Sequence, residues 1–373
     1  SNPNSVSGSD NLLLERQNRV LKKLLVTGNG QGNLTNEIIT KENYFGEEDF
    51  IKAFIENEKK INLKKYLYSK GIPLTVENNK VFPLSKTANS VVDTLRSFIE
   101  NKIEIKLNSL VESVTKEDKV FVVKTKDETF YSKNVILSVG GKSGKQFGTD
   151  GSSYKLATSF GHKLTKLYPS LVQIKTEQEK IKMLRGIREE VRLSVIEKDR
   201  EIYSTEGDVI FTDYGVSGNA VFKASSYIVD KDDIKIKLDF LKDLTEAEVV
   251  KIITDRIENA PNIKREEILS GIVNKKISET IIKEAKDSSV KGLAKELKNF
   301  TLKVTGNLGF DYSQVTRGGI VTLDVDKSSY MSKFCKGLYL TGETLDIDGE
   351  CGGYNLTFAF ITGIVSAKSI KGE

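Results

Sequence analysis

Residues 337–355 read GLYLTGETLDIDGECGGYN, and this stretch decides the fold that we expect. The apolar residues 337–340 predict a buried strand, and the apolar residues of 356–367 share one helical face. The turn between them ends at a helix start, where unpaired backbone N–H groups and the positive end of the helix dipole attract electron-rich oxygens. A strand, a glycine-rich loop and a helix in this order are typical of nucleotide-binding α/β folds.

Side chains and glycines of the same stretch suit a ligand that carries hydroxyl groups. Glu343 and Asp346 can accept hydrogen bonds from sugar-like hydroxyls, and Gly352 and Gly353 would let a ligand approach the backbone. The alternative is that these glycines only make turns. Because glycines and acids cluster at one strand-to-helix junction, we favour a binding site.

Three further stretches support this interpretation. Leu24–Thr27 predicts an apolar strand that enters the glycine-rich loop 28–33, and 134–139 predicts a buried parallel strand that runs into Gly140 and Gly141. Glu15 follows the short apolar strand 12–14. In a dinucleotide-binding fold, an acid at the end of the second strand binds ribose hydroxyls, although a glutamate after a strand is by itself a weak signal.

The pattern of the chain changes at residue 168 and returns near residue 315. From 168 the sequence is first β-rich and then helical, and Thr245 with Glu248 forms a capping box for a helix through 257. A second helix is expected over 264–273. We therefore expect an α/β domain in two parts that encloses an inserted domain, with boundaries at 1–167, 168–315 and 316–373.

Composition excludes several classes of protein. The 57 basic and 52 acidic residues are interspersed, which disfavours nucleic acid as a partner, and no run of 18 apolar residues predicts a membrane span. The single histidine, His162, excludes histidine triads and multi-histidine metal sites, and we expect it to cap a helix or face solvent. With two cysteines and no metal-ligand spacing we predict no metal site and a cytoplasmic location.

Cys351 allows two interpretations. A helix N-terminus would lower the pKa of its thiol, as in redox cysteines. No resolving cysteine is near in the sequence, however, and a small apolar residue is often needed where a helix packs on a loop. We favour the packing role.

Taken together, these motifs resemble the HI0933-like, or YhiN-like, flavoproteins, a bacterial family of NAD(P)/FAD-dependent oxidoreductases also called aminoacetone oxidase-like. The resemblance covers nearly the whole chain, and its motifs occur in the family's order. They are LLLE ending at Glu15, KKLLVTGNG at 22–30 with NLTN at 33–36, VFP at 81–83, GGKS at 140–143, FT at 211–212 with YGVSG at 214–218, VT at 315–316 with GG at 318–319, and the C-terminal stretch quoted first.

The resemblance implies a Rossmann-like FAD-binding domain with an inserted β-rich and helical domain. It also implies the cofactor contacts. These are Glu15 at the adenosine ribose, Gly140 and Gly141 near the adenine, Gly342, Glu343 and Asp346 toward the ribityl chain and pyrophosphate, Gly352, Gly353, Tyr354 and Asn355 under the isoalloxazine ring, and Gly28, Asn29, Gly30, Gly318 and Gly319 along the flavin face.

The sequence departs from the family pattern in two ways. Family members begin with an apolar strand and a Gly-x-Gly-x-x-Gly turn about 30 residues before the equivalent of Glu15, and no such strand can be read in residues 1–11. Without that strand and phosphate-binding turn, we expect weaker FAD retention. In addition, Gln31-Gly32 stands where the family commonly has Arg-Cys, and Asp213 where it commonly has His. If either family residue supplies a cation or proton donor near the flavin, this chain lacks it, and no catalytic residue is predicted.

The function that follows is a flavin-dependent oxidoreductase that transfers a hydride between FAD and a small organic substrate. NAD(P)H is a candidate electron donor, although no second dinucleotide fingerprint is visible. The alternative is a degenerate, nonredox member that binds nucleotide weakly or not at all and acts as an interaction module. A nucleic-acid-modifying flavoenzyme would require a basic cleft, for which the sequence gives no sign.

Overall fold

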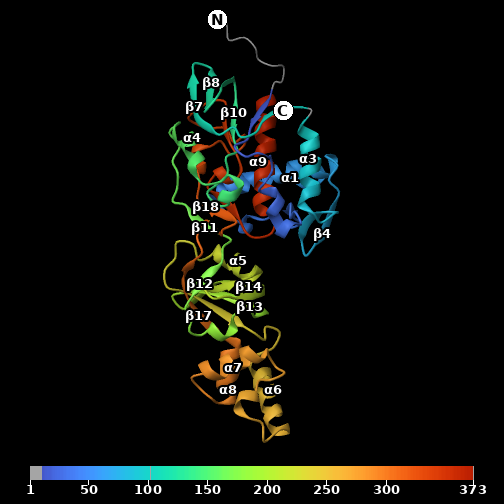
Figure 1. Cartoon of the computed structure of the whole chain (residues 1–373), viewed down its shortest axis with the longest axis vertical. Helices are drawn as coiled ribbons and strands as arrows, with labels where there is room; N and C mark the ends of the chain where they lie inside the picture. The colour runs from blue at the N-terminus through green and yellow to red at the C-terminus, as the bar shows by residue number, and fades with distance from the viewer. Residues whose placement is uncertain (1–10, 101, 373) are drawn as a thin grey trace. The chain divides into compact units, whose positions relative to one another are not determined.

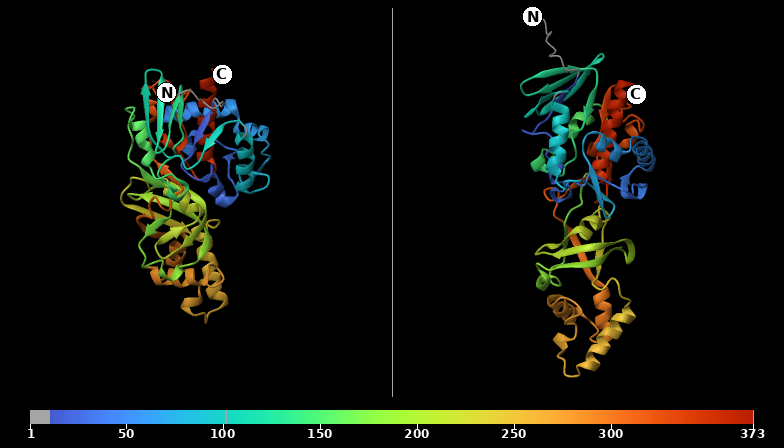
Figure 2. Two further views of the ribbon diagram at one scale, coloured as in Figure 1. Left: turned by 45° about the horizontal axis from the view of Figure 1, so that its top comes forward. Right: turned by 90° about the vertical axis from the view of Figure 1, so that its right-hand side faces the viewer.

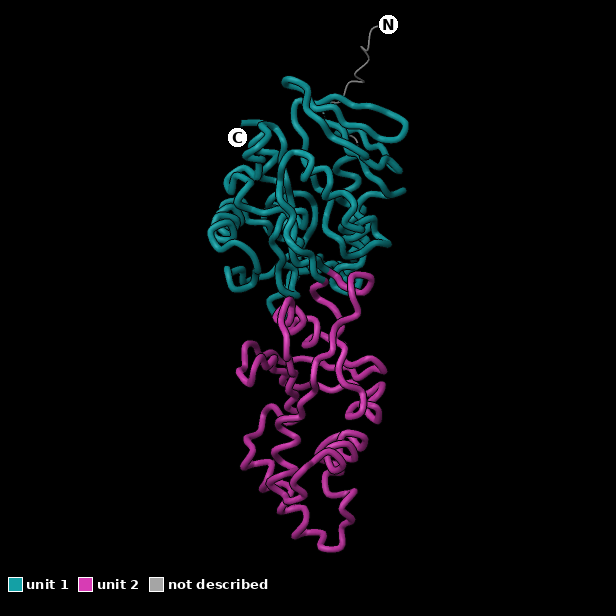
Figure 3. The backbone as a smooth tube through the Cα atoms, turned by 90° about the vertical axis from the view of Figure 1, so that its left-hand side faces the viewer, with its two compact units in different colours: residues 1–168, 315–373 teal, residues 169–314 magenta. Residues whose placement is uncertain are grey.

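The computed structural model describes residues 11–100 and 102–372. The chain divides into two compact units (Figure 3). Unit 1 comprises Ser1–Tyr168 and Val315–Glu373, and unit 2 comprises Pro169–Gln314. No helix of the described residues is both long enough and apolar enough to cross a lipid bilayer.

Unit 1 combines short strands with helices (Figure 1). Its strands are β1 (Leu12–Leu14), β2 (Thr35–Asn36), β3 (Tyr44–Gly46), β4 (Leu74–Glu77), β5 (Lys80–Pro83), β6 (Glu104–Lys106), β7 (Val111–Glu117), β8 (Val120–Thr125), β9 (Thr129–Ser132), β10 (Val135–Leu137), β18 (Val315–Arg317), β19 (Leu338–Leu340) and β20 (Ile347–Gly349). Its α-helices are α1 (Glu48–Ile61), α2 (Leu63–Ser69), α3 (Ala88–Glu100), α4 (Lys155–Thr158) and α9 (Tyr354–Lys371).

Unit 1 contains two parallel strand pairs. β1 pairs with β6, and β10 pairs with β19 in the register Ile136↔Tyr339. Within residues 11–100 and 102–372 no strand joins these two pairs into one sheet. Within the apolar run 134–139, residues Val135–Leu137 form a parallel strand as predicted, but the strand is shorter than expected and not fully buried, because Ile136 is 38% exposed.

Antiparallel strands complete unit 1. β7, β8 and β9 form a meander, which Figure 2 shows from two further sides. β2, β5 and β4 form a second sheet, and β3 pairs with β20. The pairing of β3 with β20 places Phe45 opposite Asp348.

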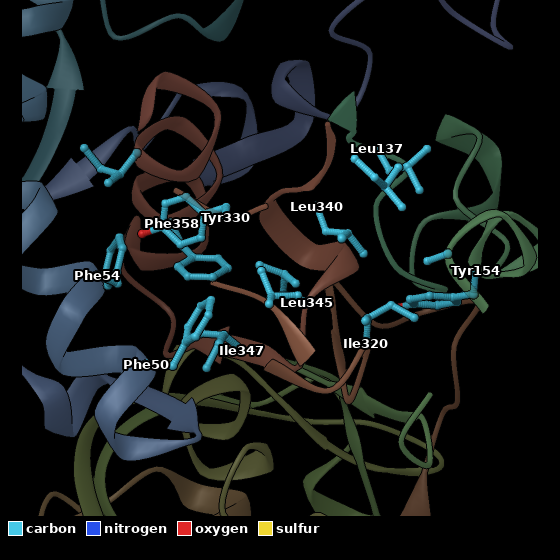
Figure 4. Close-up of a cluster of buried hydrophobic side chains, with 14 of the residues drawn as sticks. Phe50, Phe54, Leu137, Tyr154, Ile320, Tyr330, Leu340, Leu345, Ile347 and Phe358 are labelled. Carbon is cyan, nitrogen blue, oxygen red and sulfur yellow. The ribbon is translucent and has the colours of Figure 1, made fainter. Parts of the chain in front are cut away.

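The core of unit 1 lies between α9, α1 and the strand ends (Figure 4). Phe54 of α1 packs edge-on against Phe358 of α9, with ring centroids 5.0 Å apart. Phe50 packs in the same way against Tyr330 at 5.7 Å. The first contact holds α9 against α1, and the second holds the segment around Tyr330 against α1.

Unit 2 contains a closed six-stranded barrel and a group of helices. The barrel strands are β12 (Ile174–Thr176), β13 (Arg188–Glu197), β14 (Arg200–Phe211), β15 (Gly215–Ser217), β16 (Ile234–Asp239) and β17 (Phe300–Asn307), and β11 (Tyr168–Ser170) precedes them. The helices are α5 (Asn219–Ser225), α6 (Glu246–Asn259), α7 (Lys275–Glu284) and α8 (Val290–Lys298). Its apolar core is separate from that of unit 1.

Three expectations from the sequence are wrong. Leu24–Thr27 is not a strand but part of a 3₁₀ segment, Leu24–Gly30, whose only buried residue is Leu24. The stretch 264–273 contains one 3₁₀ turn, Arg265–Glu267, instead of a helix, and Gly271 with a positive φ of 81° interrupts the pattern. His162 is neither a cap nor solvated, because its ring is buried against Phe334.

Candidate functional site

Glu343 connects three segments that are far apart in the sequence. It lies in a 3₁₀ turn, Gly342–Thr344, directly after β19. Its Oε2 accepts a hydrogen bond from Lys23 Nζ at 2.6 Å, and its Oε1 accepts one from the backbone N–H of Thr316 at 2.8 Å. Lys23 also donates to the carbonyl of Ser143 at 3.2 Å. Because both side chains are partly exposed, the ion pair contributes at most about 1 kcal/mol to stability.

Gly141 is required by the close approach of Thr316. A Cβ at this position would lie 2.5 Å from Thr316 Oγ1 and 3.0 Å from the carboxyl carbon of Glu343. The same hydroxyl accepts the backbone N–H groups of Lys142 and Ser143 at 2.8 and 2.9 Å. Gly141 therefore lets the loop after β10 close onto β18, while a Cβ on Gly140 would lie 2.6 Å from the Thr149 methyl group and 4.0 Å from Glu343 Oε2.

The start of α9 packs on the chain itself. Gly353 has a φ of +95°, and a Cβ there would lie 2.6 Å from the carbonyl oxygen of Thr35. Asn355 accepts the N–H of Gly349 at 2.8 Å and donates to its carbonyl at 2.7 Å, while Asn36 donates to the carbonyl of Gly352 at 3.1 Å. Gly353 is thus needed for contact between α9 and β2, a reason that the sequence alone did not suggest.

Tyr354 belongs to the core. Its ring packs edge-on against Tyr44 at 5.8 Å, and Tyr44 Oη donates to the backbone carbonyl of Tyr354 at 3.1 Å. Burial raises the pKa of Tyr354 to about 12, and the charges of Glu350 and Cys351 add to the shift. The phenol therefore stays neutral at physiological pH.

Gly318 and Gly319 run beside the turn that carries Asp346. The N–H of Ile320 donates to the carbonyl of Thr344, and the N–H of Asp346 donates to the carbonyl of Ile320, both at 2.9 Å. Burial raises the pKa of the Asp346 carboxyl, partly opposed by a hydrogen bond from Thr165 and the charge of Arg317. The two glycines and Asp346 therefore form one structural group.

Gly28, Asn29 and Gly30 form a turn in which all three residues have positive φ. No atom lies within 4 Å of a Cβ built on Gly30, so this part of the loop borders open space. Among the described residues, no hydrogen bond joins the Glu15 side chain to Glu343 or its partners. Its Oε1 accepts the N–H of Gln17 at 2.8 Å inside its own turn.

Arg317 is a site residue that sequence reasoning missed. It is the last residue of β18, and its guanidinium carbon lies 3.9 Å from the centroid of the Phe45 ring. Its Nε donates to Oδ1 of Asp348, whose side chain is only 1% exposed. The available signal was an arginine directly before the glycine pair at 318–319.

Parallel strand pairs, a glycine-rich helix start and an acid after β19 define a Rossmann-type nucleotide-binding protein with an additional β-rich region. The chain belongs to the HI0933-like family, because the family model described as "HI0933-like protein Rossmann domain" matches residues 4–369. The chain is accordingly a flavoprotein of the oxidoreductase class.

Individual relatives are similar along almost their whole length. A "3-dehydro-bile acid delta(4,6)-reductase" of Clostridium scindens is 31% identical over 374 residues, covering 96% of this chain and 91% of the relative. A "Ribosomal RNA dihydrouridine synthase" of Haemophilus influenzae is 25% identical over 383 residues, covering 98% and 93%. Among solved structures, glycine oxidase from Geobacillus kaustophilus is 8% identical, with a TM-score of 0.36, and the match covers 97% of this chain and 88% of the oxidase.

The residues at the Glu343 site fit a flavin nucleotide. A carboxylate has about four acceptor positions, and the interactions with Lys23 and Thr316 use two of them, which leaves capacity for ligand hydroxyls. Separately from this group, Arg317 has a buried Nη2 with no hydrogen-bond partner among the described residues. FAD, when bound, would supply two-electron redox chemistry, and Glu343 would supply acceptor positions for its hydroxyls.

Proposed function

We propose that this chain is a flavin-dependent reductase that transfers a hydride from reduced FAD to a small organic substrate, at a C=C bond conjugated to a carbonyl. The proposal is supported by the 31% identity, over 96% of the chain, to the "3-dehydro-bile acid delta(4,6)-reductase" of Clostridium scindens. A 3-dehydro group is a ketone, and delta(4,6) unsaturation lies in conjugation with it. Dihydrouridine likewise differs from uridine by reduction of a C=C bond conjugated to a carbonyl.

FAD would be held mainly at the Glu343 site. Glu343 would accept ribityl hydroxyls, Glu15 the adenosine ribose, and the loop 28–30 would border the flavin. The other assignments implied by the family resemblance remain part of the proposal, with NAD(P)H as electron donor and a cytoplasmic location.

A small molecule is a better candidate substrate than RNA. In the helical part of unit 2, residues 245–299, 11 Lys and Arg residues are balanced by 10 Asp and Glu residues. Binding to an RNA backbone depends on an excess of cations that neutralise phosphates. The interspersed charges therefore favour the small-molecule substrate.

The test is spectroscopic. The purified protein, as isolated and after incubation with FAD, should show the absorbance of oxidised flavin. After anaerobic photoreduction, cyclohex-2-enone and a 3-oxo-4-ene steroid should reoxidise the flavin, while cyclohexanone should not. Protein that remains colourless after FAD addition would support the nonredox alternative, and a flavin that neither enone reoxidises would contradict the proposed reaction.

A further inference from the structure

Contacts of its strand hold the backbone of Arg317, and contacts with Asp348 and Phe45 hold its guanidinium. Its strand, β18, also contains Thr316, whose N–H and hydroxyl bind Glu343 and the 142–143 backbone. Since successive side chains of a strand point to opposite faces, Thr316 and Arg317 reach different sides of β18. The Thr316 hydroxyl therefore lies on one side of the strand, and the Arg317 guanidinium lies on the other, over Phe45.

One terminal nitrogen of this guanidinium, Nη2, has no acceptor among the described residues. Nε is bonded to Asp348, but Nη2 is buried and has no hydrogen-bond partner among residues 11–100 and 102–372. A buried donor without an acceptor is costly, and such exceptions in folded proteins point to a catalytic role or to a group that binds there. The Arg317 side chain as a whole is 20% exposed, so it is not sealed inside the core.

The group best suited to bind Nη2 is an oxygen that gains negative charge. Arginine is a donor that cannot accept and cannot be deprotonated in a protein, so its partner must be an acceptor. Asp348 already compensates one unit of charge, and Asp346 lies within electrostatic reach of the guanidinium. A permanent anion is therefore not needed at Nη2, whereas an oxygen that becomes negative during the reaction would be stabilised there.

We propose that Arg317 is the residue that binds the substrate carbonyl oxygen, an inference that rests on the function proposed above. Bound reduced FAD would supply a hydride to the carbon β to the carbonyl, so that the C=C π bond would break and its electron pair would move to the carbonyl oxygen. A proton from solvent then adds to the α carbon, and the nicotinamide donor restores the reduced cofactor. Arg317 stabilises the enolate oxygen.

The probe is 4-nitrophenol, whose phenolate form carries a negative oxygen on a conjugated planar carbon, as an enolate does. Difference absorbance distinguishes bound phenolate from bound phenol in FAD-loaded protein. The substitution R317M alone would leave Asp348 buried without its cation, a change that can prevent folding. The informative variant is therefore R317M/D348N, compared with D348N, which keeps the arginine, and with R96M, which removes an exposed arginine paired with Glu100 on α3.

We expect R317M/D348N to bind 4-nitrophenolate about tenfold to a hundredfold more weakly than D348N, the loss for one hydrogen bond to a charged group. R96M should match the wild type. Absence of phenolate binding by the wild type, equal binding by R317M/D348N and D348N, or an equal loss in R96M would overturn the proposal.

The acceptor could also be the carbonyl region of the flavin, which gains negative charge on reduction. In that case R317M/D348N would change the flavin reduction potential relative to D348N and leave phenolate binding unchanged, which overturns the substrate assignment. Failure of this assignment can be distinguished from failure of the proposed function. If no enone reoxidises the flavin but phenolate binding needs Arg317, the reaction is wrong and the oxygen site stands.

Discussion

At the residue scale, Glu343 illustrates how a carboxylate can serve the fold and a ligand together. Lys23 and the Thr316 N–H already orient it, so we expect it to present its remaining acceptor positions in a fixed direction. Substitution E343A removes these positions together with the acceptors for Lys23 and the Thr316 N–H.

We predict that E343A weakens FAD binding roughly tenfold to a hundredfold, since a hydrogen bond to a charged group contributes about 1.5–3 kcal/mol. The measurement is a fluorescence titration with FAD. E128A is the matched control, because Glu128 also binds a lysine, Lys106, at 2.6 Å but belongs to the β7–β8–β9 sheet region. Equal FAD affinity in E343A and the wild type would mean that the flavin lies elsewhere.

His162 gives a second prediction, in which pH is the variable. Its Nε2 is hydrogen bonded to Ser332 Oγ at 2.7 Å, and Nδ1 has no partner in the described part of the chain. Burial lowers the pKa of the imidazole, with the charge of Asp324 opposing the shift. The unfolded chain therefore takes up a proton near its ordinary pKa of about 6.5 while the folded protein resists it.

It follows that part of the stability present at neutral pH is lost as the pH falls below about 6.5. Substitution H162Q should remove this part, so the difference in free energy of unfolding between wild type and H162Q should shrink from pH 7 to pH 5. Urea denaturation at both pH values measures it. Because the sequence has one histidine, its proton NMR titration reads the folded pKa directly, and a value at or above the ordinary one would refute the argument.

At the scale of elements, α9 contains two glycines with opposite expected behaviour. Gly353, at the N-cap, has a positive φ, and a Cβ added to it would lie 2.6 Å from the carbonyl oxygen of Thr35. Gly363, in the helix interior, has open space where a Cβ would be added. G353A should destabilise the protein by at least about 2 kcal/mol, because an L-residue is strained there and its Cβ meets backbone. G363A should stabilise it by about 0.5–1 kcal/mol.

Thermal and urea unfolding of the two variants test this contrast. If G353A were as stable as the wild type but bound FAD less tightly, the glycine would exist for ligand approach, as the sequence first suggested. If both variants were destabilised alike, the packing of α9 on β2 would not be the cause.

At the scale of the whole molecule, we propose that residues 168–315 form a domain inserted between the two parts of the FAD-binding domain. Unit 2 has its own apolar core and a barrel that closes on itself, which leaves no unpaired sheet edge within it. The isolated segment 169–314 is therefore predicted to fold alone, with β-rich circular dichroism and one cooperative urea transition. A segment that is unfolded at neutral pH while the full chain is folded would contradict the domain division.

Local patterns determined much of the architecture from the sequence. The capping box at Thr245 and Glu248 is present as expected, with Thr245 N–H to Glu248 at 2.7 Å, and it begins α6. The strand at 337–340 and the parallel strand within 134–139 are formed, and the family membership follows from motifs that can be read in order. These features depend on residues within a few positions of each other, so the sequence contains their causes.

Only the tertiary structure decided what surrounds the site. Lys23 meets Glu343 across 320 positions of sequence, and no periodicity encodes such a pair. Gly353 is required by the backbone of Thr35, and Arg317 is placed by Phe45 and Asp348, so their roles depend on contacts between distant segments. The apolar pattern of 264–273 likewise failed to become a helix, because short patterns only favour a conformation and packing selects it.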